Sequence, residues 1–300
     1  MSPNTELAQA EVFFFEDLRP RLNGLAYRIL GSFSDAEDAV QDTFLKWAST
    51  DRLEIENTAG WLISVCTRRC LDMRRTGDRA RMDYVGAWLP EPIQVAVPPE
   101  AETRVELASS LSMAFMMMLE RLTPKERAAY LLHDIFYLSY DEIAETLDIS
   151  EPGGRKLVSR ARASVSKSKT RHATPEPRQE EFLTAFQSAV ETGELGPLAR
   201  MLAQDARLST DGGGKVAAIR DPIVGCNAIC DFVSRKLRRY WAELDWTRTD
   251  LNGSRGVLIQ ADGQTSSAVS ATFDEAGFVQ EILIVRNPEK LHSLNPVQIH

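Results

Sequence analysis

The chain has 300 residues, enough for two or three domains, and its charged fraction of 26% is ordinary for a globular protein. No apolar run approaches the roughly 18 residues of a membrane-spanning helix, and no basic segment precedes the three phenylalanines near the N-terminus, so we expect neither a membrane contact nor a secretory signal. The four cysteines are too few and too far apart for a disulfide framework, which favours the cytoplasm.

Positive charge is concentrated in two stretches of a chain whose net charge is −8. Residues 152–172 include seven basic and no acidic residues, and residues 66–82 include six arginines against two aspartates. Phosphate binding depends on such local patches rather than on the basic total. The sequence therefore predicts two candidate nucleic-acid contacts on an otherwise acidic protein.

Residues 10–84 are predicted to form an all-helical domain. Ser34 followed by Glu37 has the spacing of a capping box and predicts the start of a second helix. Asn57 or Thr58 is expected to cap a third helix. The first helix gathers its apolar residues on one face, namely Leu18, Leu22, Leu25, Ile29 and Leu30.

Two sets of side chains in this domain are candidates for binding. Acidic and aromatic residues of the second helix could dock a protein surface, although the acidic face alone would be typical of a solvated helix: Asp35, Asp38, Asp42, Phe44 and Trp47. Basic residues near an aromatic ring on the third helix could hold a phosphate backbone and stack an unpaired base: Trp61, Arg68, Arg69, Arg74, Arg75 and Arg79.

Residues 85–101 include four prolines, which favour an extended linker over a helix. A second helical domain follows over residues 102–170. Thr123 is predicted to cap a helix that has Pro124 at its first position and Glu126 at its third. The methionines at 116–118 are interpreted as core residues rather than as a cofactor site.

Residues 139–166 have the pattern of a helix–turn–helix, with a turn at 148–150 and Ser150 as the cap of the second helix. That helix, 151–166, is expected to bury Leu157, Val158 and Ala161. A solvated helix in an ordinary bundle is the alternative, but the order of turn, cap and basic helix favours DNA binding. Residues 152–154, Pro-Gly-Gly, predict a late or flexible helix start because glycine weakens helices. The residues expected to face DNA are Arg155, Lys156, Ser159, Arg160 and Arg162.

Residues 178–291 change character. Two helices are predicted, broken at Gly193 and Gly196, followed by stretches that alternate apolar and polar residues between turns rich in Gly, Asn and Asp. Alternation of period two between such turns is typical of β-hairpins. We therefore expect an α+β domain with a curved antiparallel sheet.

Three segments resemble the extracytoplasmic-function (group 4) sigma factors of the sigma-70 family. They are "DAEDAVQDTFLKW", which resembles the polymerase-binding helix, "AGWLISVCTRRCLDMRR", which resembles the −10-element helix, and "LTPKERAAYLLHDIFYLSYDEIAETLDIS…RKLVSRARA", which resembles the −35 helix–turn–helix. The resemblance implies core RNA polymerase, through its β and β′ subunits, and promoter DNA as partners. It assigns sigma region 2 to residues 10–84 and sigma region 4 to residues 102–170.

The stretches "WLPEP" (88–92), "DGGGK" (211–215) and "NPEKL" (287–291) resemble motifs of the SigJ-like subgroup, which has a C-terminal SnoaL-like domain. The resemblance implies a multi-domain fold, with two all-α DNA-binding domains, the second a helix–turn–helix, followed by a cone-shaped α+β domain over 178–291 that modulates activity. Glu289 replaces the aspartate usual in the last motif. The motifs expected to join the linker 85–101 to this domain are Trp88, Leu89, Pro90, Glu91 and Pro92; Asp211, Gly212, Gly213, Gly214 and Lys215; and Asn287, Pro288, Glu289, Lys290 and Leu291.

Relatives of SnoaL-like domains include enzymes, so an isomerase or cyclase with an accessory DNA-binding region is the alternative. Such catalysis needs an acid or base in an apolar pocket. The sequence does not place any of the candidate carboxylates in one, so we expect no catalytic residue and no cofactor, and binding of a small ligand stays open. The cysteine pairs, each at i, i+4, are interpreted as buried structural residues rather than zinc ligands, so no metal is expected. The candidate carboxylates are Asp205, Asp211, Asp231 and Asp262.

Overall fold

The computed structural model describes residues 9–51, 55–82, 84, 86–94, 111–166 and 174–294, with the backbone alone at 77–82. The chain forms two compact units. The first comprises residues 1–82 and 118–167, and the second comprises residues 83–117 and 168–300. In the described residues, no helix is both long and apolar enough to cross a membrane.

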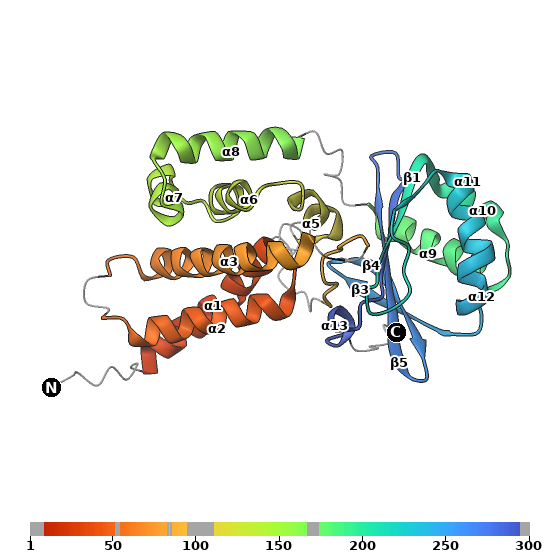
Figure 1. Ribbon diagram of the computed structural model, residues 1–300, viewed down its shortest axis with the longest axis horizontal. Helices are drawn as coiled ribbons and strands as arrows, with labels where there is room; N and C mark the ends of the chain where they lie inside the picture. The colour runs from red at the N-terminus through yellow and green to blue at the C-terminus, as the bar shows by residue number, and fades with distance from the viewer. Residues whose placement is uncertain are drawn as a thin grey trace. The chain divides into compact units, whose positions relative to one another are not determined.

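The first unit is helical throughout its described part. The apolar face predicted for the first helix is buried at Leu22, Leu25, Ile29 and Leu30, while Leu18 is half-buried. The elements of this unit are α1 (Gln9–Leu30), α2 (Phe33–Ser49), α3 (Thr58–Met82), α6 (Pro124–Tyr130), the π-helix η1 (Leu131–Ile135), α7 (Tyr140–Leu147) and α8 (Glu151–Ser166) (Figure 1).

Side chains cap these helices where the sequence indicated, with one exception. The capping box of Thr123 and Glu126 is present, and the Asn57 side chain accepts a hydrogen bond from the Gly60 amide. The prediction that Ser34 caps α2 was wrong, because the chain enters the helix two residues earlier and Ser32 accepts the hydrogen bond from the Asp35 amide instead.

The helix–turn–helix is formed by α7, a tight turn and α8. Asp148 ends α7 in the left-handed conformation, with φ 51°, and the Ser150 hydroxyl accepts a hydrogen bond from the Gly153 amide. The expected late start of the second helix was wrong, since α8 begins at Glu151. Pro152 fits the first turn of a helix, and Gly154 is buried where α8 packs against Ile143.

The second unit is built around one six-stranded sheet in the order β2-β1-β6-β5-β4-β3. The expectation of an antiparallel sheet was wrong for one pair, because β1 and β6 are parallel. Helices and four further strands separate β1 from β6 in the sequence, and such a long connection allows parallel pairing. The strands are β1 (Leu202–Asp211), β2 (Ile223–Val224), β3 (Asp245–Leu251), β4 (Ser254–Ala261), β5 (Gln264–Phe273) and β6 (Val279–Val285).

Each face of the sheet packs against a different part of this unit. On one face, residues such as Ile259 and Ile284 join helices in the main core, which includes Phe182 and Phe186. On the other face, Leu258 and Leu283 pack against Leu89 of the linker and Leu291 near the C-terminus. The helices of the unit are α5 (Met113–Leu119), which runs into the first unit, and α9 (Glu176–Glu191), α10 (Leu195–Met201), α11 (Cys226–Phe232), the π-helix η2 (Val233–Leu237), α12 (Arg238–Trp241) and α13 (Pro288–Leu291) (Figure 1).

Candidate nucleic-acid interface and linker clamp

The exposed face of α8 carries the basic residues predicted to face DNA. Its buried face consists of Gly154, Val158, Ala161 and Val165, whereas Leu157 is only half-buried. Because the buried positions recur every three or four residues, the opposite side of the helix is solvent-facing along its whole length. All five predicted side chains are exposed there: Arg155, Lys156, Ser159, Arg160 and Arg162.

These five side chains differ in how firmly the protein holds them. The Arg162 guanidinium forms a bidentate pair with Asp134, at 2.7 and 3.1 Å, and the hydrogen bond raises the pKa of Arg162. Arg155 pairs with Glu151 at 2.6 Å and stacks over the Tyr140 ring. Within the described residues, Lys156 and Arg160 have no ion-pair partner. Those two cations are therefore the most available for phosphate oxygens.

The arginines of α3 make contacts within the first unit. Arg69 pairs with Asp42 at 2.7 Å, and Arg75 pairs with Asp72. Arg68 donates to the carbonyl oxygens of Glu145 and Thr146, at 2.9 and 3.0 Å, at the C-terminal end of α7. A cation is favourable at a helix C-terminus, where carbonyl groups are left without helical partners. Arg68 therefore ties α3 to the helix–turn–helix.

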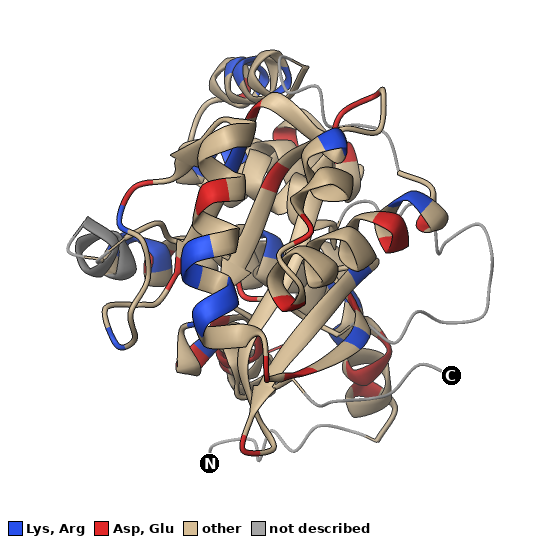
Figure 2. Cartoon of the chain, turned by 90° about the vertical axis from the view of Figure 1, so that its right-hand side faces the viewer, with Lys and Arg blue, Asp and Glu red and all other residues tan. Residues whose placement is uncertain are grey.

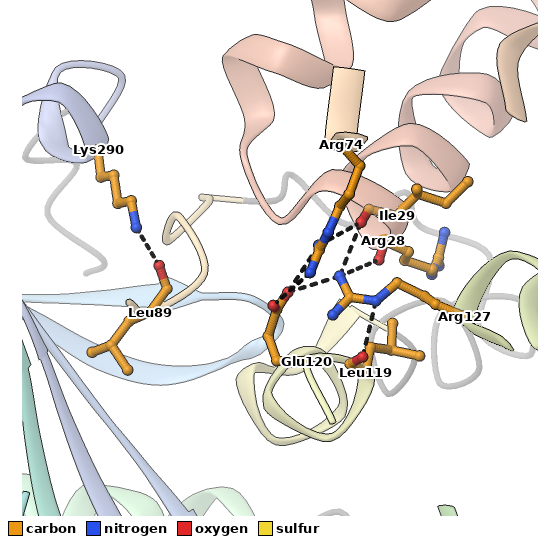
Figure 3. A network of polar contacts seen from close by, with 8 residues as sticks. All are labelled: Arg28, Ile29, Arg74, Leu89, Leu119, Glu120, Arg127 and Lys290. Atoms are coloured by element: carbon orange, nitrogen blue, oxygen red, sulfur yellow. Dashed lines mark hydrogen bonds and ion pairs between the residues drawn. The ribbon is translucent and has the colours of Figure 1, made fainter. Parts of the chain in front are cut away.

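Arg74 is a structural residue in this arrangement, contrary to its predicted role at the −10 element. Its side chain is only 7% exposed, donates to the Ile29 carbonyl at 3.0 Å and pairs with Glu120 at 3.0 Å. The fully buried Arg127 also pairs with Glu120, at 2.7 Å, and donates to the Leu119 and Ile29 carbonyls (Figure 3). One carboxylate thus balances two buried guanidinium groups that join α3 to α6.

The predicted protein-docking surface on α2 is only partly exposed. Asp35 and Asp38 are exposed and Asp42 is half-buried. Trp47 is only 3% exposed and packs on Trp61 with ring centroids 5.6 Å apart. Trp47 is therefore a core residue and not part of the predicted docking surface.

Two other hydrophobic residues of α2 lie nearer the surface. Phe44 is half-buried and packs edge-on against Phe15. The sequence analysis missed Leu45, which is 57% exposed on the same helix. The available signal was its position one helical turn after Asp42 and two turns after Asp38, on the acidic side of the helix. Arg79, predicted to contact DNA, belongs to α3, but its side chain lies outside the described part of the structure.

In the second unit, the three motifs expected to join the linker to the C-terminal domain meet at the carboxylate of Asp211. This side chain is fully buried. One oxygen accepts from the Tyr84 hydroxyl and the Gly213 amide, and the other accepts from the Leu89 amide at 2.9 Å and the Lys290 ammonium at 2.7 Å. We call this arrangement the linker clamp: Tyr84, residues 88–92, 211–215 and 287–291.

Lys290 links all three motifs of the clamp. Its ammonium also donates to the Leu89 carbonyl (Figure 3) and lies over the Trp88 ring, 4.1 Å from the centroid. Residues 89–92 are buried, and Lys215 pairs with Glu289. Gly213 has φ +62°, and any side chain there would collide with the Asn287 amide. The glycine loop is therefore needed for close approach between two segments.

Tyr84 is a clamp residue that the sequence analysis missed. Its hydroxyl donates to Asp211 and accepts from the Asn287 amide at 3.1 Å. Burial, followed by the hydrogen bond to Asp211, raises the pKa of Tyr84. An aromatic residue directly after an arginine-rich helix gave no specific signal, because only the fold brings it to a carboxylate 127 residues away.

The four cysteines are all free thiols. Cys66, Cys70 and Cys230 are buried and Cys226 is half-buried, and burial raises the pKa of Cys230 to about 11. Among the described residues, no cluster of three His, Cys, Asp or Glu side chains could hold a metal ion. Thiols in such surroundings behave as small apolar groups.

Comparison with known proteins agrees with this arrangement. The sigma-70 region 2 family matches residues 14–80, and the sigma-70 region 4 family matches residues 112–165. The ECF RNA polymerase sigma factor SigJ of Mycobacterium tuberculosis (strain ATCC 25618 / H37Rv) is 32% identical over 290 residues, or 93% of each chain. The probable ECF RNA polymerase sigma factor SigI of the same strain is 31% identical over 281 residues, covering 92% of this chain and 93% of the relative.

A solved structure shows the same fold. The crystal structure of Mycobacterium tuberculosis SigJ superposes with a TM-score of 0.72 at 29% identity, covering 96% of this chain and 100% of that chain. Helical sigma domains followed by an α+β domain, as expected from the sequence, are confirmed. The chain therefore belongs to the extracytoplasmic-function family of RNA polymerase sigma factors.

Proposed function

We propose that this sigma factor acts in the cytoplasm and brings core RNA polymerase to promoters through two separate DNA contacts, under the control of its C-terminal domain. Residues 10–84 would bind polymerase and the −10 element, residues 102–170 would bind the −35 element, residues 85–101 would serve as the linker, and residues 178–291 would regulate. The observation that supports this most directly is the exposed basic face of α8 behind a well-formed turn.

For the −35 element, α8 is the helix that would enter the major groove. Lys156 and Arg160 extend from it without ion-pair partners in the described part of the chain, so they can reach phosphates or base edges at no cost in broken contacts. Ser159 lies between Lys156 and Arg160 in the sequence, and its hydroxyl can hydrogen-bond to a phosphate or to a base edge. Arg155 and Arg162 would contribute after leaving Glu151 and Asp134, which are themselves at the surface.

For the −10 element, the exposed arginines of α3 are the better candidates. Among the described residues, the ion-pair partners of Arg69 and Arg75 are the surface carboxylates of Asp42 and Asp72, and such pairs contribute about 1 kcal/mol or less. Trp61 is half-buried nearer the start of the same helix and could stack a base of a melted strand. Arg68 would have to leave the end of α7 to take part, whereas Arg74 would stay in the core.

For core polymerase, α2 supplies the docking surface. Asp35 and Asp38 are exposed, and Leu45 offers an exposed apolar anchor further along the same helix. An apolar side chain surrounded by charges is a common form of protein interface. We propose that this surface meets the β and β′ subunits.

The C-terminal domain is proposed to regulate through the linker clamp rather than to catalyse a reaction. The Asp211 carboxylate is occupied by four donors. Asp205, Asp231 and Asp262 are exposed at the surface rather than enclosed in an apolar pocket. These positions do not favour the isomerase or cyclase alternative, which needs a carboxyl group in an apolar pocket.

Transcription by core polymerase in the presence of the full chain tests the regulatory part. Asp211→Asn weakens the clamp, because a carboxamide oxygen is a poorer acceptor for an ammonium group. Asp262→Asn makes the same change at an exposed carboxylate outside the clamp and serves as the control. A change in transcript amount with Asp211→Asn alone supports regulation through the clamp, and its sign tells whether the clamped state activates or inhibits. Equal output from both variants and the unaltered chain contradicts it.

A further inference from the structure

Four of the five residues from 235 to 239 are basic, in the helical stretch that runs from η2 into α12. They are Arg235, Lys236, Arg238 and Arg239, and all are exposed. The neighbouring Tyr240 is 65% exposed. The opposite side of the stretch is buried in the main core at Val233, Leu237 and Trp241. The stretch thus presents one basic face, which we call the 235–240 surface.

Most of the charge on the 235–240 surface is uncompensated. Arg235 pairs with Asp231, at 2.6 Å, but within the described residues Lys236, Arg238 and Arg239 have no ion-pair partner. In Figure 2, which looks at this side of the unit, the basic turns follow one another with no acidic turn between them. Like charges three and four positions apart destabilise a helix. The helix dipole favours cations only in the last turn, so it does not account for the positive charges of Arg235 and Lys236, which lie before that turn.

A cluster of this kind fits a partner that carries dense negative charge. Arginine donates paired hydrogen bonds to phosphate oxygens, and exposed tyrosine hydroxyls also contact phosphates. The core of a protein interface contains few charged residues, whereas four of the six residues from 235 to 240 are cations and Tyr240 supplies one exposed aromatic ring. The surface also lies outside the linker clamp and outside the helix–turn–helix.

We propose that the 235–240 surface is a further DNA contact, which holds the phosphate backbone of promoter DNA without reading its sequence. The inference rests on the proposed function, because promoter binding brings the whole chain to DNA. The C-terminal domain would then strengthen promoter binding directly, besides any action through the clamp.

The test compares two variants that lose the same number of charges from the same unit. Arg238→Gln/Arg239→Gln alters the 235–240 surface. Arg207→Gln/Arg220→Gln alters two exposed arginines elsewhere, which have no ion-pair partner in the described part of the unit. Each full-length variant is combined with core polymerase, and its dissociation constant for a promoter fragment with a long upstream flank is measured over a range of salt concentrations. Thermal unfolding of both variants checks that they are folded.

If both arginines contact phosphates, the slope of log affinity against log salt falls by about 1.8 for the surface variant, at about 0.9 for each phosphate. The control keeps the slope of the unaltered protein, and transcription start sites do not move. Equal slopes for the two variants overturn the inference. Loss of binding to core polymerase without DNA also overturns it, because the contact would then be with protein. If the unaltered chain forms no promoter complex at all, the proposed function fails and the inference with it.

Discussion

The ammonium of Lys290 lies 2.7 Å from the carboxylate of Asp211, and both side chains are buried: that of Asp211 is 0% and that of Lys290 9% exposed. An ion pair taken out of water is stable only when its remaining hydrogen-bonding capacity is also satisfied. Here the carboxylate has three further donors, and the ammonium has the Leu89 carbonyl and the Trp88 ring. The pair therefore stabilises the clamp together with these further contacts, and not as an isolated ion pair.

Lys290→Met is expected to lower the free energy of unfolding by about 3–5 kcal/mol, because the Asp211 carboxylate would stay buried without its counter-ion. Urea denaturation of the full chain measures this. Lys215→Gln is the control, since the Lys215–Glu289 pair is largely exposed and should contribute about 1 kcal/mol or less. Similar losses for both variants would show that the buried pair is no stronger than a surface pair.

The Tyr84 hydroxyl should resist ionisation. Burial and the neighbouring Asp211 carboxylate raise the pKa of Tyr84 above the usual value of about 10 for tyrosine. The neutral phenol is therefore favoured in the folded state, so its contribution to stability is complete below pH of about 10 and is lost as the pH rises through the folded-state value.

Titration of phenolate absorbance in the full chain and in Tyr84→Phe measures this difference. The variant should lack one tyrosine, and the missing ionisation should be one that occurs above the usual range. If the missing ionisation falls at the usual pH, the Tyr84–Asp211 contact does not form in solution.

Glu120→Gln is expected to destabilise the first unit by about 3–5 kcal/mol, because it leaves the buried guanidinium groups of Arg74 and Arg127 without their shared negative charge. Glu151→Gln, which breaks the exposed pair with Arg155, should change stability by about 1 kcal/mol or less. Urea denaturation compares the two. A loss for Glu120→Gln as small as that of its control would contradict the assignment of Arg74 to the core.

Asp134→Asn should strengthen binding to the −35 element, because it releases the Arg162 guanidinium from its bidentate partner on an exposed helix. The slope of log affinity against log salt should become steeper by about 0.9 for the one additional phosphate contact. Lys156→Gln/Arg160→Gln should instead reduce the slope by about 1.8. Binding of holoenzyme to promoter fragments measures both. An unchanged slope for Asp134→Asn would mean that Arg162 stays away from DNA.

The sequence predicted best what local patterns determine. Ser150, the turn before it and the apolar spacing of residues 151–166 were sufficient to predict α8 and its exposed basic face. The change to an α+β domain was equally visible, because period-two alternation and Asn-Gly or Asp-Gly turns form hairpins whatever surrounds them. The parallel pairing of β1 with β6 joins strands far apart in the chain, which no local pattern specifies.

Burial of polar and aromatic side chains was harder to predict. Arginine and tryptophan are common on binding surfaces, yet tertiary packing places Arg74 and Trp47 in the core, beside Glu120 and Trp61 respectively. Tyr84 joins the clamp for the same kind of reason, through a partner distant in the sequence. The clamp motifs themselves were anticipated only through resemblance, because glycines and prolines in separate loops do not reveal which loops meet.

Mapping of transcript 5′ ends tests the central claim most directly. Core RNA polymerase is combined with the full chain and a pool of genomic DNA fragments, and with Lys156→Gln/Arg160→Gln as a folded variant. The account predicts discrete start sites that core polymerase alone does not produce, preceded by shared −10 and −35 sequences, and weaker initiation at the same sites with the variant. Transcripts no different from those of core polymerase alone would contradict it.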